Sequence, residues 1–497
     1  MDAQMQPSSQ DVTTSMWRYG MSLWRALDRE RLEFFDPFRI AAQIGFRAAR
    51  HHPPSAETSW HLMQYNAGLL NRAWLANQEQ LTSYALEEGA KGWNAWFNTL
   101  LGTPGETIEQ FAERQADVMD AVANFNRQIE RVRDDFGFQF RSADYKLVHE
   151  TSCFLMYQVV PLDKSVKVRR DLKPMLLVPP YMLGVHILAF LPHEKKSYAH
   201  AFADAGIPTY VRVVKDIWEN EKVQTMTPED DCLQTRELCA VLMEKHGQKV
   251  TLNGTCQGGY ISLMNILSGR LRNVCDTLIS NVTPVDGTFS AAISNVPRMG
   301  HDFVLSQLPN GNFVANGYLL SLGMRLTALD HETPLVQVLN QARLEERGGL
   351  AQSRSTAALF RWLRKERVHL PPAIAEMSSI TFEQPVAADG TLPVRLFGQP
   401  LMIGDLAALN IRWYQDYAVK DDLVTPACAT AGNRLVEASG LLESVPFPGG
   451  HVAILTSPYN PKAPVNGRFV APNGCVSRGP VLFQLEIGER PKLNGPA

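Results

Sequence analysis

Short apolar runs alternate with helical segments through the middle of this chain, and this alternation restricts its fold more than any other feature. The runs are rich in Val, Leu, Ile and Tyr, and segments such as 198–205 and 228–246 between them have the composition of helices. Strands that alternate with helices predict an α/β fold, a mostly parallel sheet covered by helices on both faces. The predicted strands lie at residues 146–150, 154–160, 175–180, 208–214, 249–254, 276–282, 409–417 and 440–447.

A different pattern occupies residues 1–140. Between residues 59 and 136 Pro and Gly are rare, apart from a break at 102–105, and apolar residues recur at intervals of three and four. This spacing predicts a helical N-terminal region. Its apolar faces either pack as a scaffold on the rest of the chain or on a second subunit, or they form an amphipathic surface for a partner or a lipid-like phase. The spacing is clearest in Leu62, Tyr65, Leu69 and Trp74 and in Phe111, Val118, Val122 and Phe125.

The alternating pattern covers residues 141–460, with one interruption at about 295–395. We expect this insertion to form a lid over the carboxyl edge of the sheet, where an α/β protein places its site. Residues 461–497 are rich in Pro, Gly and Asn, a composition that predicts an irregular C-terminal tail.

The composition excludes several classes of protein. With 45% hydrophobic residues the chain can bury a large core, and 48 Lys and Arg against 51 Asp and Glu leave a formal net charge of −3. A protein without a basic excess is not expected to bind nucleic acid. The seven cysteines form no C-x-x-C pair, so we expect no disulfide framework, no metal site and a reducing cytoplasmic location.

The sequence predicts neither a secretory signal peptide nor a membrane-spanning segment. The N-terminus lacks the basic start and apolar run of a secretory signal peptide. The most apolar stretch, residues 175–192, is interrupted by Pro and Gly, so we expect no integral membrane segment.

The segment from Leu252 to Tyr260 is the most informative one for chemistry. It reads LNGTCQGGY and connects a predicted strand to a helical run at 261–267. It fits a nucleophile elbow, G-x-S-x-G, in which Cys256 replaces Ser. Glycines leave room around a sharp strand-to-helix turn, and the N-terminus of the following helix favours a thiolate and a developing oxyanion. The alternative is a buried cysteine in a Gly-rich turn.

Two further candidates follow in the chain order nucleophile, acid, base that such an elbow requires. Asp421 and Asp422 come after the predicted strand at 409–417, and either could present a carboxylate at its end. His451 follows Gly449 and Gly450, whose small size would let its loop approach the nucleophile.

Residues from about 145 to 460 resemble the polyhydroxyalkanoate synthases, polyester polymerases with an α/β-hydrolase fold and a Cys nucleophile in a G-x-C-x-G-G box. The box is matched by residues 254–259, and the resemblance places the acid at Asp422 and the base at His451. The sequence departs from the family at Leu423, where synthases usually carry His, and it lacks their Trp-Asn-x-Asp lid signature. The other matching stretches lie at residues 147–157, 176–180, 227–231 and 396–401.

The resemblance implies an acyltransferase that polymerises (R)-3-hydroxyacyl-CoA through an acyl-Cys256 intermediate and needs no cofactor. The backbone N–H of Gln257 and a second donor at Tyr181 or Met182 would form the oxyanion hole. Implied partners are the hydroxyacyl-CoA substrate, the surface of a polyester granule and a second copy of the chain, in the cytoplasm or at the granule. The alternatives are an intracellular polyester depolymerase or acyl-CoA thioesterase of the same fold, and a non-catalytic granule-associated protein.

Overall fold

The structure is a computed structural model that describes residues 9–51, 56–290, 304–318, 320–321, 339 and 354–488. Its chain divides into two compact units. The helical unit comprises residues 1–133, 297–299 and 322–361, and the α/β unit comprises residues 134–296, 300–321 and 362–497.

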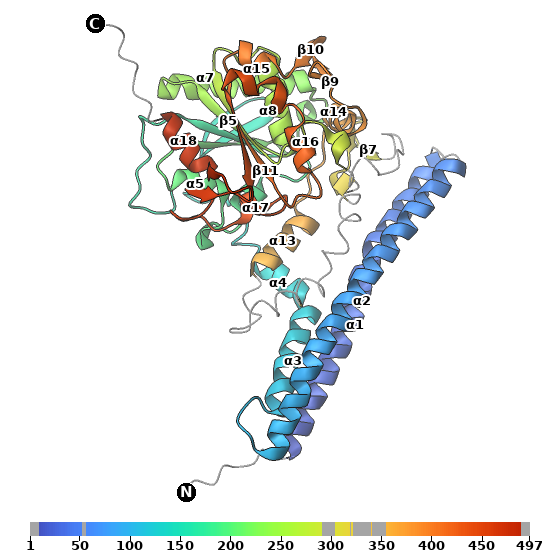
Figure 1. Cartoon of the computed structure of the whole chain (residues 1–497). Helices are drawn as coiled ribbons and strands as arrows, with labels where there is room; N and C mark the ends of the chain where they lie inside the picture. The colour runs from blue at the N-terminus through green and yellow to red at the C-terminus, as the bar shows by residue number, and fades with distance from the viewer. Residues whose placement is uncertain are drawn as a thin grey trace. The chain divides into compact units, whose positions relative to one another are not determined.

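The helical unit contains the helical N-terminal region that the sequence predicts, with two long helices drawn in blue in Figure 1. Phe34 of the first helix contacts Trp74 of the second edge to face, with ring centroids 6.3 Å apart. The third helix begins with a capping box. The Thr107 side chain accepts from the N–H of Gln110, and the Gln110 side chain accepts from the N–H of Thr107. The helices are α1 (Ser9–His51), α2 (Ala56–Leu101), α3 (Ile108–Ala123) and α4 (Phe125–Arg131).

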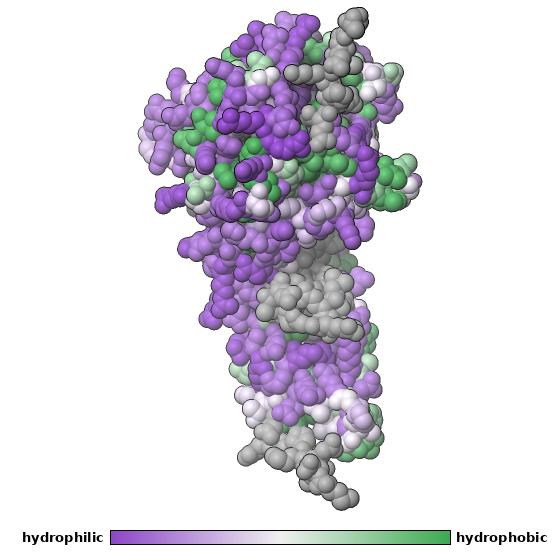
Figure 2. All heavy atoms as spheres, turned by 90° about the vertical axis from the view of Figure 1, so that its left-hand side faces the viewer, coloured by the Kyte–Doolittle hydropathy of each residue, from purple (hydrophilic) through white to green (hydrophobic). Residues whose placement is uncertain are grey.

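The apolar positions of the helical unit divide between core and surface. Those expected in α3 and α4, at Phe111, Val118, Val122 and Phe125, are buried. In α2, Trp74 is exposed, and the side chains of residues 62, 65 and 69 lie outside the described residues. On the face shown in Figure 2, the side chains in the lower part of the view are mainly hydrophilic, with apolar ones along one edge.

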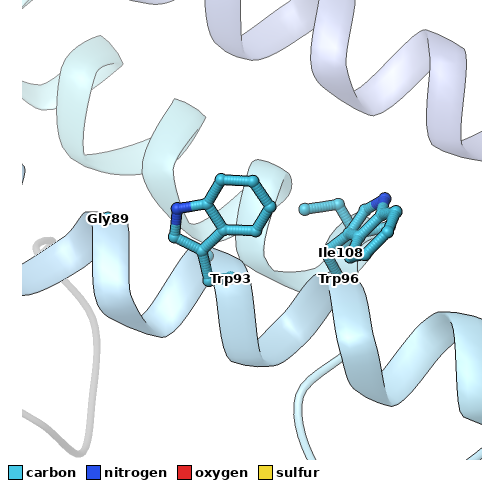
Figure 3. Close-up of a pocket in the computed structure, with 5 residues that line it drawn as sticks. Gly89, Trp93, Trp96 and Ile108 are labelled. Carbon is cyan, nitrogen blue, oxygen red and sulfur yellow. The ribbon is translucent and has the colours of Figure 1, made fainter.

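A shallow pocket lies on the surface of the helical unit. Trp93 and Trp96 project from α2 beside Ile108 and line it together with Gly89 and Gly92 (Figure 3). None of these residues belongs to the α/β unit. Within the described part of the chain, no helix is both long enough and apolar enough to cross a membrane.

The α/β unit is built on one sheet of eight strands in the order β1-β2-β4-β3-β5-β6-β11-β12. Strands β4, β3, β5, β6, β11 and β12 run parallel to one another, and β2 pairs antiparallel with both β1 and β4. This confirms the predicted mostly parallel sheet. The strands are β1 (Tyr145–Glu150), β2 (Phe154–Val159), β3 (Met175–Val178), β4 (Thr209–Val214), β5 (Val250–Thr255), β6 (Cys275–Asn281), β11 (Arg412–Ala418) and β12 (Leu442–Phe447).

Helices cover both faces of this sheet (Figure 1). On one face α8 and α7 pack against β5, and on the other α5 contacts β4 and α18 contacts β11. The α18 contact includes Phe483 stacked on Tyr414, with ring centroids 4.0 Å apart. Because successive side chains of a strand point to opposite faces, each central strand buries both of its sides. The helices are α5 (Tyr198–Ala203), α6 (Glu221–Gln224), α7 (Pro228–His246), α8 (Gln257–Leu267), α15 (Asp405–Ala408), α16 (Pro426–Thr430), α17 (Ala453–Thr456) and α18 (Pro480–Gly488).

The predicted lid lies partly outside the described residues. Its described part includes α14, whose residue Ser378 hydrogen-bonds to Gln257 at the start of α8. A two-stranded hairpin of β9 and β10 then leads back to the sheet. The elements of this insertion and hairpin are β7 (Leu305–Gln307), β8 (Phe313–Ala315), α13 (Arg354–Lys365), α14 (Pro372–Glu383), β9 (Thr391–Leu396) and β10 (Gln399–Met402).

The prediction of an irregular tail after residue 460 was wrong for its described part. This segment forms a hairpin of β13 (Arg468–Val470) and β14 (Val476–Arg478), followed by α18. Pro and Gly separate these short elements instead of preventing them. Arg478 pairs with Glu443 of β12, and α18 covers the sheet through the ring stacking described above.

Candidate active site

Cys256 occupies the turn between β5 and α8 in a strained backbone conformation. Its φ of 51° and ψ of −121° lie where residues other than Gly rarely occur. Three backbone hydrogen bonds hold this turn. The N–H of Cys256 donates to Asn281 O at 2.8 Å, and the carbonyl oxygen of Cys256 accepts from the N–H groups of Gly259 and Tyr260. A strained residue that is held this firmly is typical of a nucleophile elbow.

The positions beside Cys256 require glycine, because other segments of the same protein pack closely against them. A Cβ atom on Gly258 would lie 2.1 Å from the carbonyl oxygen of Val178. A Cβ atom on Gly259 would lie 1.9 Å from Thr283 Oγ1. Both distances are far inside van der Waals contact, so β3, α8 and the loop after β6 meet around the elbow only because these residues lack side chains.

His451 lies in the loop between β12 and α17, and parallel pairing of β11 with β12 carries it to the same edge of the sheet as Cys256. The last paired residues of the two strands are Ala418 and Phe447. Beyond them, the N–H of Lys420 donates to Gly449 O at 2.9 Å and ties the two following loops together. The carboxyl ends of parallel strands therefore bring residues about 200 positions apart into one site.

Asp421, and not Asp422, is the partner of this histidine. Asp421 Oδ2 lies 2.7 Å from His451 Nδ1, and Asp421 Oδ1 accepts the N–H groups of Leu423 at 2.9 Å and Val424 at 2.8 Å. The Asp421 side chain is fully buried, whereas Asp422 is exposed. The assignment of the acid to Asp422 is therefore corrected. Two backbone N–H groups fix the Asp421 carboxylate inside the turn, which leaves the next side chain in solvent.

The environment of His451 favours its protonated form. Burial lowers the pKa of His451, but the Asp421 carboxylate, Cys256 and hydrogen bonds to both side chains outweigh it and raise the pKa to about 10. The Nδ1 atom faces Asp421, so the other ring nitrogen is the one left for Cys256. The three side chains thus form a connected series from carboxylate to imidazole to thiol.

The predicted oxyanion donors lie at the elbow, but two of them are already bonded. Gln257 is the first residue of α8, so its N–H has no partner within the helix. The N–H of Tyr181 donates to the side-chain Oε1 of Gln257 at 3.0 Å, and the N–H of Met182 donates to the same oxygen at 3.4 Å. The loop after β3 therefore directs these two N–H groups toward the elbow, and a side-chain carbonyl accepts from them.

A buried ion pair anchors the Tyr181 side chain, and sequence reasoning did not find it. Arg212 Nη1 lies 2.9 Å from Asp231 Oδ2, and both side chains are 1% exposed. The Tyr181 hydroxyl donates to the same Asp231 oxygen. Asn265 donates to the other carboxylate oxygen at 2.7 Å. These residues come from β4, α7 and α8, and no sequence signal indicates that they meet.

Among the described residues, no group of three or more His, Cys, Asp or Glu side chains gathers in a way that could hold a metal ion. All seven cysteines are free, and only Cys475 is exposed. Beside the elbow lie a thiol, an imidazole, a carboxylate and backbone donors. This set suits nucleophilic attack on an acyl carbon.

Searches against models of protein families and against curated proteins found no match. Solved structures are similar at low identity. Brefeldin A esterase, a bacterial homologue of human hormone-sensitive lipase, is 13% identical, with a TM-score of 0.34 over 68% of this chain and 80% of that chain. The thioesterase domain from the curacin biosynthetic pathway is 12% identical, with a TM-score of 0.33 over 63% and 95%. Est1E from Butyrivibrio proteoclasticus is 10% identical, with a TM-score of 0.29 over 62% and 91%.

Similarities this distant indicate no substrate. The sheet order, the strained turn after β5 and the loops that follow β11 and β12 are those expected of the fold predicted from the sequence. The chain has the α/β-hydrolase fold.

Proposed function

We propose that this protein is an acyltransferase that forms polyester from (R)-3-hydroxyacyl-CoA through an acyl-Cys256 intermediate. The observation that supports it is His451, which contacts both the buried Asp421 carboxylate and Cys256 at a strained elbow. The choice of substrate rests on the resemblance of residues 145–460 to polyhydroxyalkanoate synthases. Asp421 takes the role of acid in this proposal.

In the first step the Cys256 sulfur attacks the carbonyl carbon of the thioester. His451 holds the proton of the Cys256 thiol as an imidazolium, and the bond between the acyl carbon and the CoA sulfur breaks. His451 then returns the proton to the CoA thiolate, so that CoA leaves as a thiol. Asp421 orients the imidazole and stabilises its charged form throughout.

In the second step the hydroxyl oxygen of another hydroxyacyl unit attacks the acyl-Cys256 carbon. His451 accepts the hydroxyl proton, an ester bond forms, and the bond to the Cys256 sulfur breaks. The departing thiolate is left beside the protonated His451, so the site returns to its starting state.

A thiol suits this reaction better than a hydroxyl does. Transfer of an acyl group from the CoA sulfur to the Cys256 sulfur exchanges one thioester for another, so the acyl group stays activated for attack by an alcohol. A serine at this position would form an ordinary ester and lose that activation. This feature favours acyl transfer over the hydrolase alternatives, in which water would be the second nucleophile.

Incubation of the purified full chain with (R)-3-hydroxybutyryl-CoA tests the proposal. Release of CoA together with insoluble polyester supports it. Release of CoA with only free 3-hydroxybutyrate identifies a thioesterase, and hydrolysis of added polyester without CoA chemistry identifies a depolymerase. A folded protein that carries out none of these reactions would instead be non-catalytic.

The variant Cys256→Ala checks the nucleophile directly. We expect CoA release to fall by about 1,000-fold or more, because the covalent route is lost. Cys475→Ala is the matched control, since Cys475 is the one exposed cysteine and should leave the rate unchanged. Unchanged CoA release from a folded Cys256→Ala protein would contradict the proposed mechanism.

A further inference from the structure

The Gln257 side chain bonds to both candidates for the second oxyanion donor, the backbone N–H groups of Tyr181 and Met182. Its amide oxygen accepts from Tyr181 N–H at 3.0 Å and from Met182 N–H at 3.4 Å. This oxygen belongs to a carbonyl group and accepts two N–H groups, as the oxygen of a bound acyl group would in an oxyanion hole. Because Gln257 directly follows Cys256, its own backbone N–H lies at the same place in the chain as the first oxyanion donor.

The other end of the same amide is also held. Gln257 Nε2 donates to Ser378 Oγ at 2.5 Å. The Ser378 hydroxyl in turn donates to Ile374 O at 2.8 Å, within α14. The hydroxyl proton is therefore already used, which leaves Ser378 as an acceptor for the amide of Gln257. A helix of the insertion thus fixes the orientation of the amide on the donors.

The backbone that carries the donors is much less free to move than this side chain. The Tyr181 ring is buried, and its hydroxyl bonds to Asp231 in the Arg212 ion pair. Gly258 lies so close to the carbonyl oxygens of Val178 and Pro179 that not even a methyl group would fit between them. The Gln257 side chain, by contrast, is only partly buried and is held by hydrogen bonds between neutral groups.

We propose that the Gln257 amide is a displaceable occupant of the oxyanion donors, which the acyl oxygen of a substrate must replace before Cys256 can be acylated. The inference rests on the proposed acyl chemistry of Cys256. It assigns Ser378 as the group that holds the amide in its occupying position. Release of this contact would couple the position of α14 to the reactivity of the site.

The variant Gln257→Met tests this role, because Met keeps the approximate volume of Gln but cannot accept from the two N–H groups. The rate of Cys256 acylation is measured with p-nitrophenyl acetate, so that the result does not depend on the natural acyl donor. The rate of alkylation by iodoacetamide is measured in parallel, since alkylation develops no oxyanion. We expect acylation to become about 3- to 10-fold faster and alkylation to change by less than about twofold.

Ser378→Ala should raise the acylation rate in the same direction by a smaller factor, because it removes only the contact that holds the amide. Ser379→Ala is the matched control on the same helix and should leave both rates unchanged. Gln257→Ala provides a second test if Gln257→Met does not fold.

Three results would overturn the inference. Slower or unchanged acylation in the folded Gln257 variants would show that the amide positions the loop and does not compete with the substrate. An equal rise in acylation and alkylation would show that the side chain only shields the thiol. Absence of acylation in both wild type and variant would contradict it as well. Failure of wild-type protein to release CoA from hydroxyacyl-CoA, with acylation by the nitrophenyl ester intact, would contradict only the proposed function.

Discussion

The elbow of the α/β unit and the long helices of the helical unit differ in how tightly their residues are packed against other segments of the protein. A Cβ atom on Gly258 would lie 2.1 Å from a carbonyl oxygen, whereas one on Gly20 in α1 would meet nothing within 4 Å. Trp413 in β11 is 0% exposed, whereas Trp93 in α2 is 66% exposed. At the elbow, several distant segments decide which residue is tolerated. In the helices the local requirements of a helix largely decide it, so substitutions should behave differently in the two regions.

The largest expected effect separates the two neighbouring aspartates beside the elbow. Asp421→Asn removes the charge that orients and stabilises the His451 imidazole, so we expect kcat for CoA release to fall about 1,000-fold, or about 4 kcal/mol. Asp422→Asn alters an exposed side chain and should change kcat by less than about twofold. Steady-state kinetics of the two variants decides between them. An equal loss in both would remove the assignment of Asp421.

A pair of glycine substitutions compares the two regions directly. Gly258→Ala should destabilise the α/β unit by about 3 kcal/mol, because the added methyl group overlaps the Val178 carbonyl. Gly20→Ala should instead stabilise α1 by about 0.5 to 1 kcal/mol, because the space is open and Ala is the better helix former. Hydrogen exchange of amides in β5 and in α1 reports each unit separately. Equal effects at both sites would contradict the comparison.

The stability of the elbow should depend on pH through His451. Burial lowers its pKa but Asp421 and Cys256 outweigh this, so the folded-state pKa is about 10 against an ordinary value of 6.5. A pKa raised by folding gives a stabilisation that is complete below pH 6.5 and is lost as the pH rises through about 10. The free energy of unfolding of wild type relative to His451→Gln should therefore decrease over this window. A flat difference would show that the imidazole is not held as a charged group.

The smallest effect is expected in the pocket of the helical unit. Trp93 and Trp96 are 66% and 44% exposed, and their pocket contains no residue of the α/β unit. The double variant Trp93→Ser and Trp96→Ser should therefore change CoA release from a soluble thioester by less than about twofold. Rates of CoA release from the soluble thioester, measured at several enzyme concentrations for the wild type and the double variant, test this expectation. A large loss would show that the helices contribute to the chemistry itself.

Much of the fold could be predicted because its signals are local. The capping box at Thr227 and the left-handed Gly247 mark the ends of α7, and the predicted helix at 228–246 has the observed bounds. The tail was mispredicted for the opposite reason. Nothing near Phe483 indicates that its ring will stack on Tyr414, about 70 residues earlier in the chain.

The sequence indicated which loops carry the candidate site, but it did not always indicate which residue of a loop takes part. Cys256 and His451 could be selected as candidates because glycines mark the turns that carry them. Asp421 and Asp422 have the same side chain and adjacent positions, so composition and spacing could not separate them. The choice depends on which carboxylate accepts the N–H groups of Leu423 and Val424, and only a folded turn shows that.

The sequence by itself determined the alternation of strands and helices, the tight turn at Cys256 and the types of residue available for chemistry, because these follow from local spacing and the small size of glycine. The tertiary structure alone decided which acid meets His451, what anchors Tyr181 and what accepts its backbone N–H. These are contacts between segments far apart in the chain, and they arise from the pairing order of the parallel strands, which no local pattern records.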